Sequence, residues 1–130
     1  MNNSEKARKL YEECDGTNPE RNTLMPSKYM HDNNYDIYAE LFIGIVVNYY
    51  ATKEFENDLV PISKEDLFIR SDDKEGWTNM KRAIYKLKKK SLIEVIEKEN
   101  KKFARILVDD FYDPELYRRQ NIDDRIETIK

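Results

Sequence analysis

Side chains that can hydrogen-bond to DNA recur between Thr78 and Lys89 at spacings of three and four residues. In DNA recognition, Arg pairs with the O6 and N7 atoms of guanine, Asn pairs with adenine, and Thr contacts the thymine methyl group. Arg82, Asn79 and Thr78 supply these three chemistries. The side chains suited to backbone phosphates in the same segment are Lys81, Lys86, Lys89 and Tyr85. The segment therefore predicts a surface that contacts double-stranded DNA.

A second group of cations follows at Lys98, Lys101 and Lys102, within a Lys-Glu-Asn-Lys-Lys sequence that is typical of a turn. Strand-like segments flank this turn at residues 92–97 and 103–108. The pattern predicts a β-hairpin whose tip, residues 98–102, rests on phosphates.

The charge distribution supports both interpretations. Residues 74–105 contain 11 Lys or Arg and 4 Asp or Glu, whereas the rest of the chain contains 12 and 22. Phosphate binding depends on charges within about one Debye length, near 10 Å, so this local excess matters more than the net charge of −3.

A helix over residues 74–90 would position the first group, with Ser71 or Asp72 as its N-terminal cap. Its apolar residues fall on one face: Trp77, Met80, Ala83, Ile84 and Leu87. Successive helical residues turn by about 100°, so the polar candidates lie opposite. We expect this helix to enter the major groove.

A shorter helix should precede it, because Ser63-Lys64-Glu65-Asp66 matches a capping pattern. This helix would bury Leu67, with Phe68 as a second candidate for burial, and end near residues 70–73.

The segment Ile37–Lys53 predicts a core helix that is apolar on both faces, although Leu41–Val47 could also form a buried strand. Its second face needs a cover from the N-terminal helix, the C-terminal tail or a second subunit. The N-terminal helix is expected over Ser4–Cys14, capped by Ser4, and an extended connector over Thr17–Asn34.

Together these elements predict a mainly α fold with a small β-hairpin, a winged helix-turn-helix with an extra N-terminal helix and an acidic C-terminal tail. The expected organisation is an N-terminal helix and connector at 1–34, a winged-helix domain at 35–108 and an acidic extension at 109–130.

The segments Ile62–Leu67, Met80–Leu87 and Leu92–Val95 resemble the winged-helix superfamily of bacterial DNA-binding proteins. In that superfamily a capped helix precedes a helix with an Arg-Ala-x-x-x-Leu core, a Leu-Ile pair and a hairpin wing. The resemblance implies that Thr78, Asn79, Arg82 and the wing lysines face DNA.

The chain departs from this family at Ser91, where Gly is usual, and in the longer, acidic turn Arg70–Lys74. Upstream, Leu24–Lys28 followed by a long apolar helix is similar to the N-terminal domains of plasmid and phage replication initiators.

The leading hypothesis is a sequence-specific DNA-binding protein of a mobile element, a transcriptional regulator or a replication accessory. A homodimer is expected, because half-sites need paired readers and the core helix has two apolar faces. The alternative is a winged-helix module for protein contacts, a phage adaptor or inhibitor whose acidic surface engages a basic partner without binding DNA.

An enzyme is not expected, because His31 is the only histidine and Cys14 the only cysteine. No Cys/His set has metal-ligand spacing, the paired aspartates are more typical of caps and loops, and three scattered glycines form no phosphate-binding loop. We therefore expect no cofactor and no bound metal. The longest apolar run, Leu41–Val47, is too short to span a membrane, and the lone cysteine suits the cytoplasm.

Overall fold

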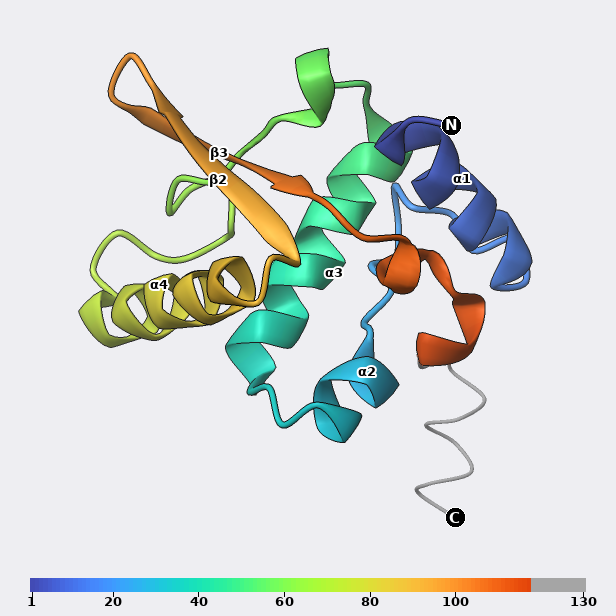
Figure 1. Ribbon diagram of the computed structural model, residues 1–130, viewed down its shortest axis with the longest axis horizontal. Helices are drawn as coiled ribbons and strands as arrows, with labels where there is room; N and C mark the ends of the chain where they lie inside the picture. The colour runs from blue at the N-terminus through green and yellow to red at the C-terminus, as the bar shows by residue number, and fades with distance from the viewer. Residues whose placement is uncertain (118–130) are drawn as a thin grey trace.

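The structure is a computed structural model that describes residues 1–117 of the chain (Figure 1). Its helices are α1 (Asn3–Glu13), α2 (Ser27–Asp32), α3 (Ile37–Thr52) and α4 (Lys74–Lys89), with short 3-10 helices at Glu56–Asp58, Asp109–Tyr112 and Pro114–Leu116. Its strands are β1 (Val60–Pro61), β2 (Ile93–Lys98) and β3 (Lys101–Ile106). The expectation of a mainly α fold with a small β component is confirmed.

The central element is α3, so a helix and not a strand forms at Leu41–Val47. It begins at a cap in which the Asp36 carboxylate accepts a hydrogen bond from the backbone N–H of Ala39, at 3.0 Å. Buried residues cover more than half of the circumference of α3, and Leu41, Ile45 and Tyr49 on the remaining side are half-buried, which matches its apolar sequence on both faces.

The second face of α3 is covered by α1 and the connector, within the same chain. The side-chain N–H groups of Asn48 donate to the Tyr11 hydroxyl at 3.0 Å and to the carbonyl of Pro19 at 2.7 Å. Gly44 allows a close approach, because an added Cβ would lie 2.8 Å from Met25 Sδ and 2.9 Å from the Leu24 carbonyl oxygen. The connector residues Leu24 and Met30 are buried against the body.

Two local expectations for this half of the chain were wrong. Asn2, not Ser4, caps α1, because the buried Ser4 hydroxyl donates instead to the carbonyl of Lys53 at 2.9 Å. The connector is also not wholly extended: α2 forms at Ser27–Asp32 and buries Met30.

The described part of the acidic C-terminal extension packs against the body. Phe111 and Tyr117 are buried, and the Phe111 ring meets Tyr29 of α2 edge to face at 4.9 Å. The Tyr112 hydroxyl donates to Asn3 Oδ1 of α1 at 2.9 Å. Residues 118–130 of that extension lie outside the described part of the chain.

The three strands form an antiparallel sheet in the order β1-β3-β2. The two-residue β1 pairs Val60 with Ala104 and Pro61 with Phe103, and the backbone N–H of Ile62 continues the ladder to Lys102 O at 3.1 Å. Proline has no N–H to donate, so its place on an edge strand is favourable. Sequence reasoning missed β1, because two residues carry no alternation.

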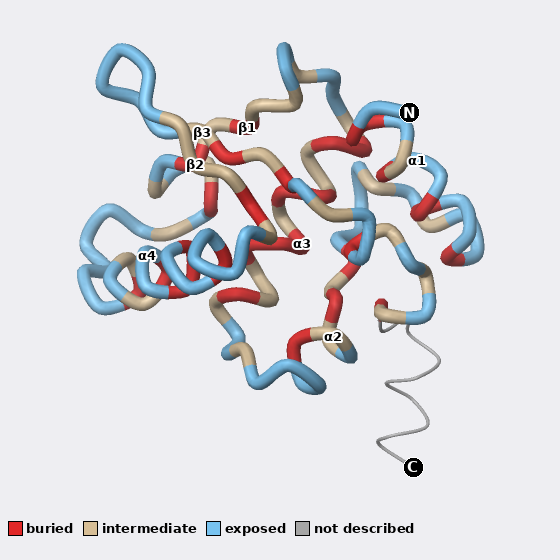
Figure 2. Tube along the Cα trace, in the orientation of Figure 1, coloured by how far each residue is buried: buried red, intermediate tan, exposed pale blue. Residues whose placement is uncertain are grey.

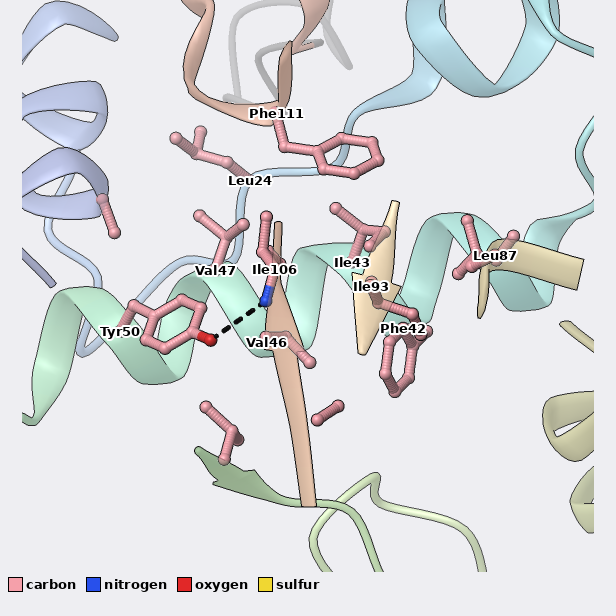
Figure 3. Packing of buried hydrophobic residues seen from close by; sticks show 14 of the residues in the cluster. Leu24, Phe42, Ile43, Val46, Val47, Tyr50, Leu87, Ile93, Ile106 and Phe111 are labelled. Carbon is pink, nitrogen blue, oxygen red and sulfur yellow. Dashed lines mark hydrogen bonds between the residues drawn. The ribbon is translucent and has the colours of Figure 1, made fainter. Parts of the chain in front are cut away.

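The core is a single cluster to which α1, the connector, α3, α4, the sheet and Phe111 all contribute (Figure 3). Tyr50 ties α3 to the sheet: its hydroxyl donates to the Asp58 carbonyl at 2.6 Å and accepts from Ile106 N at 3.3 Å. Burial raises the pKa of Tyr50 to about 12, so the phenol stays protonated and can donate well into the alkaline range. No helix in residues 1–117 is both long and apolar enough to cross a lipid bilayer.

Candidate nucleic-acid interface

The segment expected to form a short helix is a single turn, Ser63–Phe68. Its start matches the capping pattern: Ser63 N donates to Asp66 Oδ2 at 2.9 Å and Asp66 N donates to Ser63 Oγ at 3.2 Å. Its end follows at once, because Phe68 adopts a left-handed backbone with φ of 58°. Ile69 N then bonds back to Lys64 O at 2.9 Å, which closes the turn as in a Schellman motif. A longer helix was therefore the wrong expectation. Leu67 is buried as expected, whereas Phe68 is exposed, because the left-handed backbone closes the turn at this residue.

The next helix, α4, begins at a cap formed by Asp73, so Ser71 and Asp72 were the wrong candidates. Asp73 Oδ1 accepts from Gly76 N at 2.8 Å. Gly76 suits this cap, because an added Cβ would lie 2.2 Å from Asp73 Oδ2.

The turn that ends α4 contains Ser91, a serine with a left-handed backbone. Ser91 has φ of 59°, the left-handed conformation that glycine adopts most easily. Ser91 N bonds to Lys88 O at 2.9 Å and Leu92 N to Leu87 O at 3.1 Å, a Schellman closure made without glycine. The helix therefore ends at Lys89, close to the expected boundary.

One face of α4 lies on the core and the other is open, as Figure 2 shows by the alternation of buried and exposed residues. Met80, Ala83, Ile84 and Leu87 are buried, and Trp77 is half-buried against the cluster. The candidates Thr78, Lys81, Arg82, Tyr85, Lys86 and Lys89 are exposed, and Asn79 is half-buried. We call this exposed side of α4 the cationic face.

Two polar candidates already have intramolecular partners. The Thr78 hydroxyl donates to the carbonyl of Lys74 at 2.9 Å. Asn79 Oδ1 accepts from Arg82 Nη1 at 3.5 Å, the outer limit for a hydrogen bond. Both contacts are local to α4 and exposed, so both groups can exchange these partners for a ligand.

The cations of the cationic face have no acidic partner in the described chain: the ion pairs of residues 1–117 all lie elsewhere. The acids before the helix are occupied, because Asp72 pairs with Arg70 at 3.1 Å and Asp73 caps the helix. No carboxylate of residues 1–117 therefore forms an ion pair with the cations of this face.

The hairpin differs slightly from its expected bounds. The strands run on to Lys98 and Lys101, which face each other in register, so only Glu99 and Asn100 form the turn. Both have positive φ, 50° and 66°, as a two-residue type I′ turn requires. Lys98, Lys101 and Lys102 are exposed. Figure 1 shows the hairpin tip and α4 on the same side of the molecule, away from α1.

The structure also brings Lys64 to this region, a residue that sequence reasoning used only as part of a capping pattern. Its ammonium nitrogen lies 5.9 Å from the ring centroid of Trp77 on α4. No local sequence pattern links Lys64 to Trp77, since their contact depends on how the chain between them folds back.

The residues considered for other chemistry lie apart. His31 is exposed on α2, and Cys14 is buried at the end of α1. Within residues 1–117 no three His, Cys, Asp or Glu side chains gather as a metal site would require.

No protein-family model, curated protein or solved structure matches the chain.

Proposed function

We propose that the protein is a sequence-specific double-stranded DNA-binding protein of the winged helix-turn-helix type, with α4 in the major groove. The supporting arrangement is the order α3, β1, the Ser63–Phe68 turn, α4, β2 and β3, with the sheet order β1-β3-β2. This order presents one helix and one β-hairpin on the same side of the molecule.

The observation that carries the proposal is the cationic face itself. It combines exposed cations that lack acidic partners in the described chain with the groups that read base edges. An α-helix is about 10–12 Å across, and the major groove, about 12 Å wide, admits it. Arg82 would read a base, while Lys86, Lys89 and the hairpin lysines would contact phosphates.

The proposed biological role is transcriptional regulation or replication of a mobile element, with the protein acting as a homodimer. Within one chain, α1 and the connector cover the second face of α3, so this face does not require a second subunit. The remaining argument for a dimer is that paired half-sites in DNA need two reading helices. Two copies on one bound duplex in analytical ultracentrifugation would support the dimer, and one copy would contradict it.

The test is binding to duplexes selected from a random pool at a fixed salt concentration. Replacing Arg82, Lys86 and Lys89 together by Ala should lower the slope of log affinity against log salt by about two, because two lysine–phosphate contacts are lost. Loss of the Arg82 contact should cost a further amount of binding free energy, about 1–3 kcal/mol. Arg82→Ala alone should also relax preference at one base position.

A matched control removes three cations elsewhere: Arg8, Lys9 and Lys28, each of which pairs with a carboxylate on the surface. This control changes the net charge equally and should keep wild-type affinity. An unchanged binding isotherm for the α4 variant would contradict the proposal.

Phe68 favours a second candidate, a protein-contact module. Its side chain is 76 % exposed, although its ring stacks on Tyr49 at 6.4 Å. Aromatic residues are enriched in protein interfaces, and the acidic body suits a basic partner. This candidate would be favoured if the wild-type protein does not bind DNA at low salt but binds one basic protein stoichiometrically. The Phe68→Ser variant should then no longer bind that protein.

A further inference from the structure

Trp77, the only tryptophan in the chain, lies where α4 borders the Ser63–Phe68 turn. Two ammonium groups approach its ring: Lys81 Nζ is 5.8 Å from the ring centroid and Lys64 Nζ is 5.9 Å from it. Lys81 follows Trp77 by about one helical turn, whereas Lys64 comes from the separate turn. The fold therefore gathers two cations from different segments at one aromatic side chain.

Neither of these cations is neutralised within the described chain. No carboxylate in residues 1–117 lies within ion-pair distance of Lys64 or Lys81. The nearby Asp66 carboxylate is engaged in the cap, where it accepts from Ser63 N and Ser63 Oγ. The ring attracts each ammonium group through its negative face, but it carries no net charge. Two positive charges thus lie 5.8 and 5.9 Å from the centroid of one ring, and neither pairs with a carboxylate of residues 1–117.

The contact also fixes where these charges lie relative to the cationic face. Lys81 is exposed and lies on the flank of that face, on the same edge as Trp77. Lys64, which is half-buried, extends the positive surface from α4 onto the turn. A DNA strand that follows α4 in the major groove would pass this edge.

We propose that Lys64 and Lys81 form a phosphate clamp, which binds the DNA backbone beside Trp77 and fixes the register of α4 in the groove. The clamp rests on the proposed DNA binding and adds to it a contact from outside α4 and the hairpin. A phosphodiester supplies the negative charge that the pair lacks, and each ammonium group offers three N–H donors. Phosphate contacts of this kind position a reading helix without reading sequence.

The experiment follows the binding of a selected duplex to the full chain over about 50 to 200 mM salt, through the anisotropy of labelled DNA and the emission of Trp77. Lys64→Ala and Lys81→Ala should each lower the salt slope by about one, and the double variant by about two. In the wild type the Trp77 emission should change with the same midpoint as the anisotropy, because phosphate moves the two cations relative to the ring. The double variant should lose this change.

Three further variants separate the clamp from a structural role. Lys64→Arg with Lys81→Arg keeps both charges and should keep the salt slope. Lys9→Ala on α1 removes an equal charge far from α4 and should leave both the slope and the emission change intact. If Lys64→Ala fails to fold, Lys64→Gln keeps most of the side-chain stem and tests the same charge.

The outcomes distinguish the clamp from the function on which it rests. If the wild type binds the duplex and removal of Lys64 changes neither the slope nor the emission response, the clamp is wrong and DNA binding stands. If the wild type binds no selected duplex at low salt, the proposed function fails and the clamp fails with it.

Discussion

The helices α3 and α4 have the same length, 16 residues, and both begin at an aspartate whose carboxylate accepts from a backbone N–H three residues later. Yet α3 is buried or half-buried around nearly its whole circumference, whereas α4 is buried on one face and open on the other. The two helices thus share their length and their type of cap, and the distribution of apolar residues determines how much of each is covered.

The difference also separates stability from recognition. On α3, most side chains belong to the core or pack against it, so few positions are free to change. On α4, Met80, Ala83 and Leu87 are buried in the core, and the residues opposite them are exposed, except for the half-buried Asn79. A surface with that freedom can acquire binding residues at little cost to the fold.

The largest expected effect comes from truncating a core residue of α3. Phe42 is completely buried, and Phe42→Ala should lower the free energy of unfolding by about 3–5 kcal/mol, because the substitution loses apolar burial and leaves a cavity. On α4, Tyr85→Ala should change it by less than about 0.5 kcal/mol, since Tyr85 is 62 % exposed. Chemical denaturation of both variants measures the contrast.

If Phe42→Ala and Tyr85→Ala lowered the free energy of unfolding by similar amounts, the assignment of α4 as a helix with one open face would be contradicted. A large cost at Tyr85 in particular would mean that another part of the protein, or a second copy, covers the cationic face.

A smaller effect is expected where the connector crosses α3. Gly44→Ala should destabilise the protein by about 1–3 kcal/mol, because the added Cβ would lie 2.9 Å from the Leu24 carbonyl, a backbone atom that cannot rotate away. Alanine normally stabilises a helix relative to glycine by about 0.5–1 kcal/mol, so the sign of the effect is diagnostic. Thermal unfolding provides the measurement.

Ile37→Ala is a suitable control, since Ile37 belongs to α3 but is 56 % exposed. The stability of this variant should stay near that of the wild-type protein. A gain in stability for Gly44→Ala would show that the connector does not lie against this face of α3.

The smallest effect is expected at the end of α4. Ser91→Gly should raise the free energy of unfolding by about 0.5–1 kcal/mol. Glycine avoids the cost of a left-handed backbone, roughly 1–2 kcal/mol for an L-residue. Part of this gain is offset, because glycine loses more conformational entropy on folding. Ser71→Gly is the matched control, because Ser71 is exposed and does not have a positive φ, so it should give no gain. Urea denaturation compares the pair.

Loss of stability in Ser91→Gly would mean that the serine side chain contributes more than its backbone costs. DNA affinity should be unchanged in either case, because Ser91 follows the cationic face.

The sequence predicted the elements that depend on local pattern. The spacing of Trp77, Met80 and Leu87 located α4 within one residue at its end, and the Asn-containing turn located the hairpin. The expectation failed at Ser63–Phe68, where a cap was present but a left-handed residue ended the helix after one turn. No pattern warned of this, since phenylalanine rarely adopts that conformation.

By itself the sequence determined that α3 would be apolar on both faces, that α4 would carry its charge opposite its apolar face, and that the positive charge would concentrate in residues 74–105. Only the tertiary structure decided that α1 and the connector cover α3, that β1 pairs with β3, and that Lys64 meets Trp77. The physical reason is that helical periodicity and charge are properties of neighbouring residues, whereas these contacts join distant segments whose placement depends on how the whole core packs.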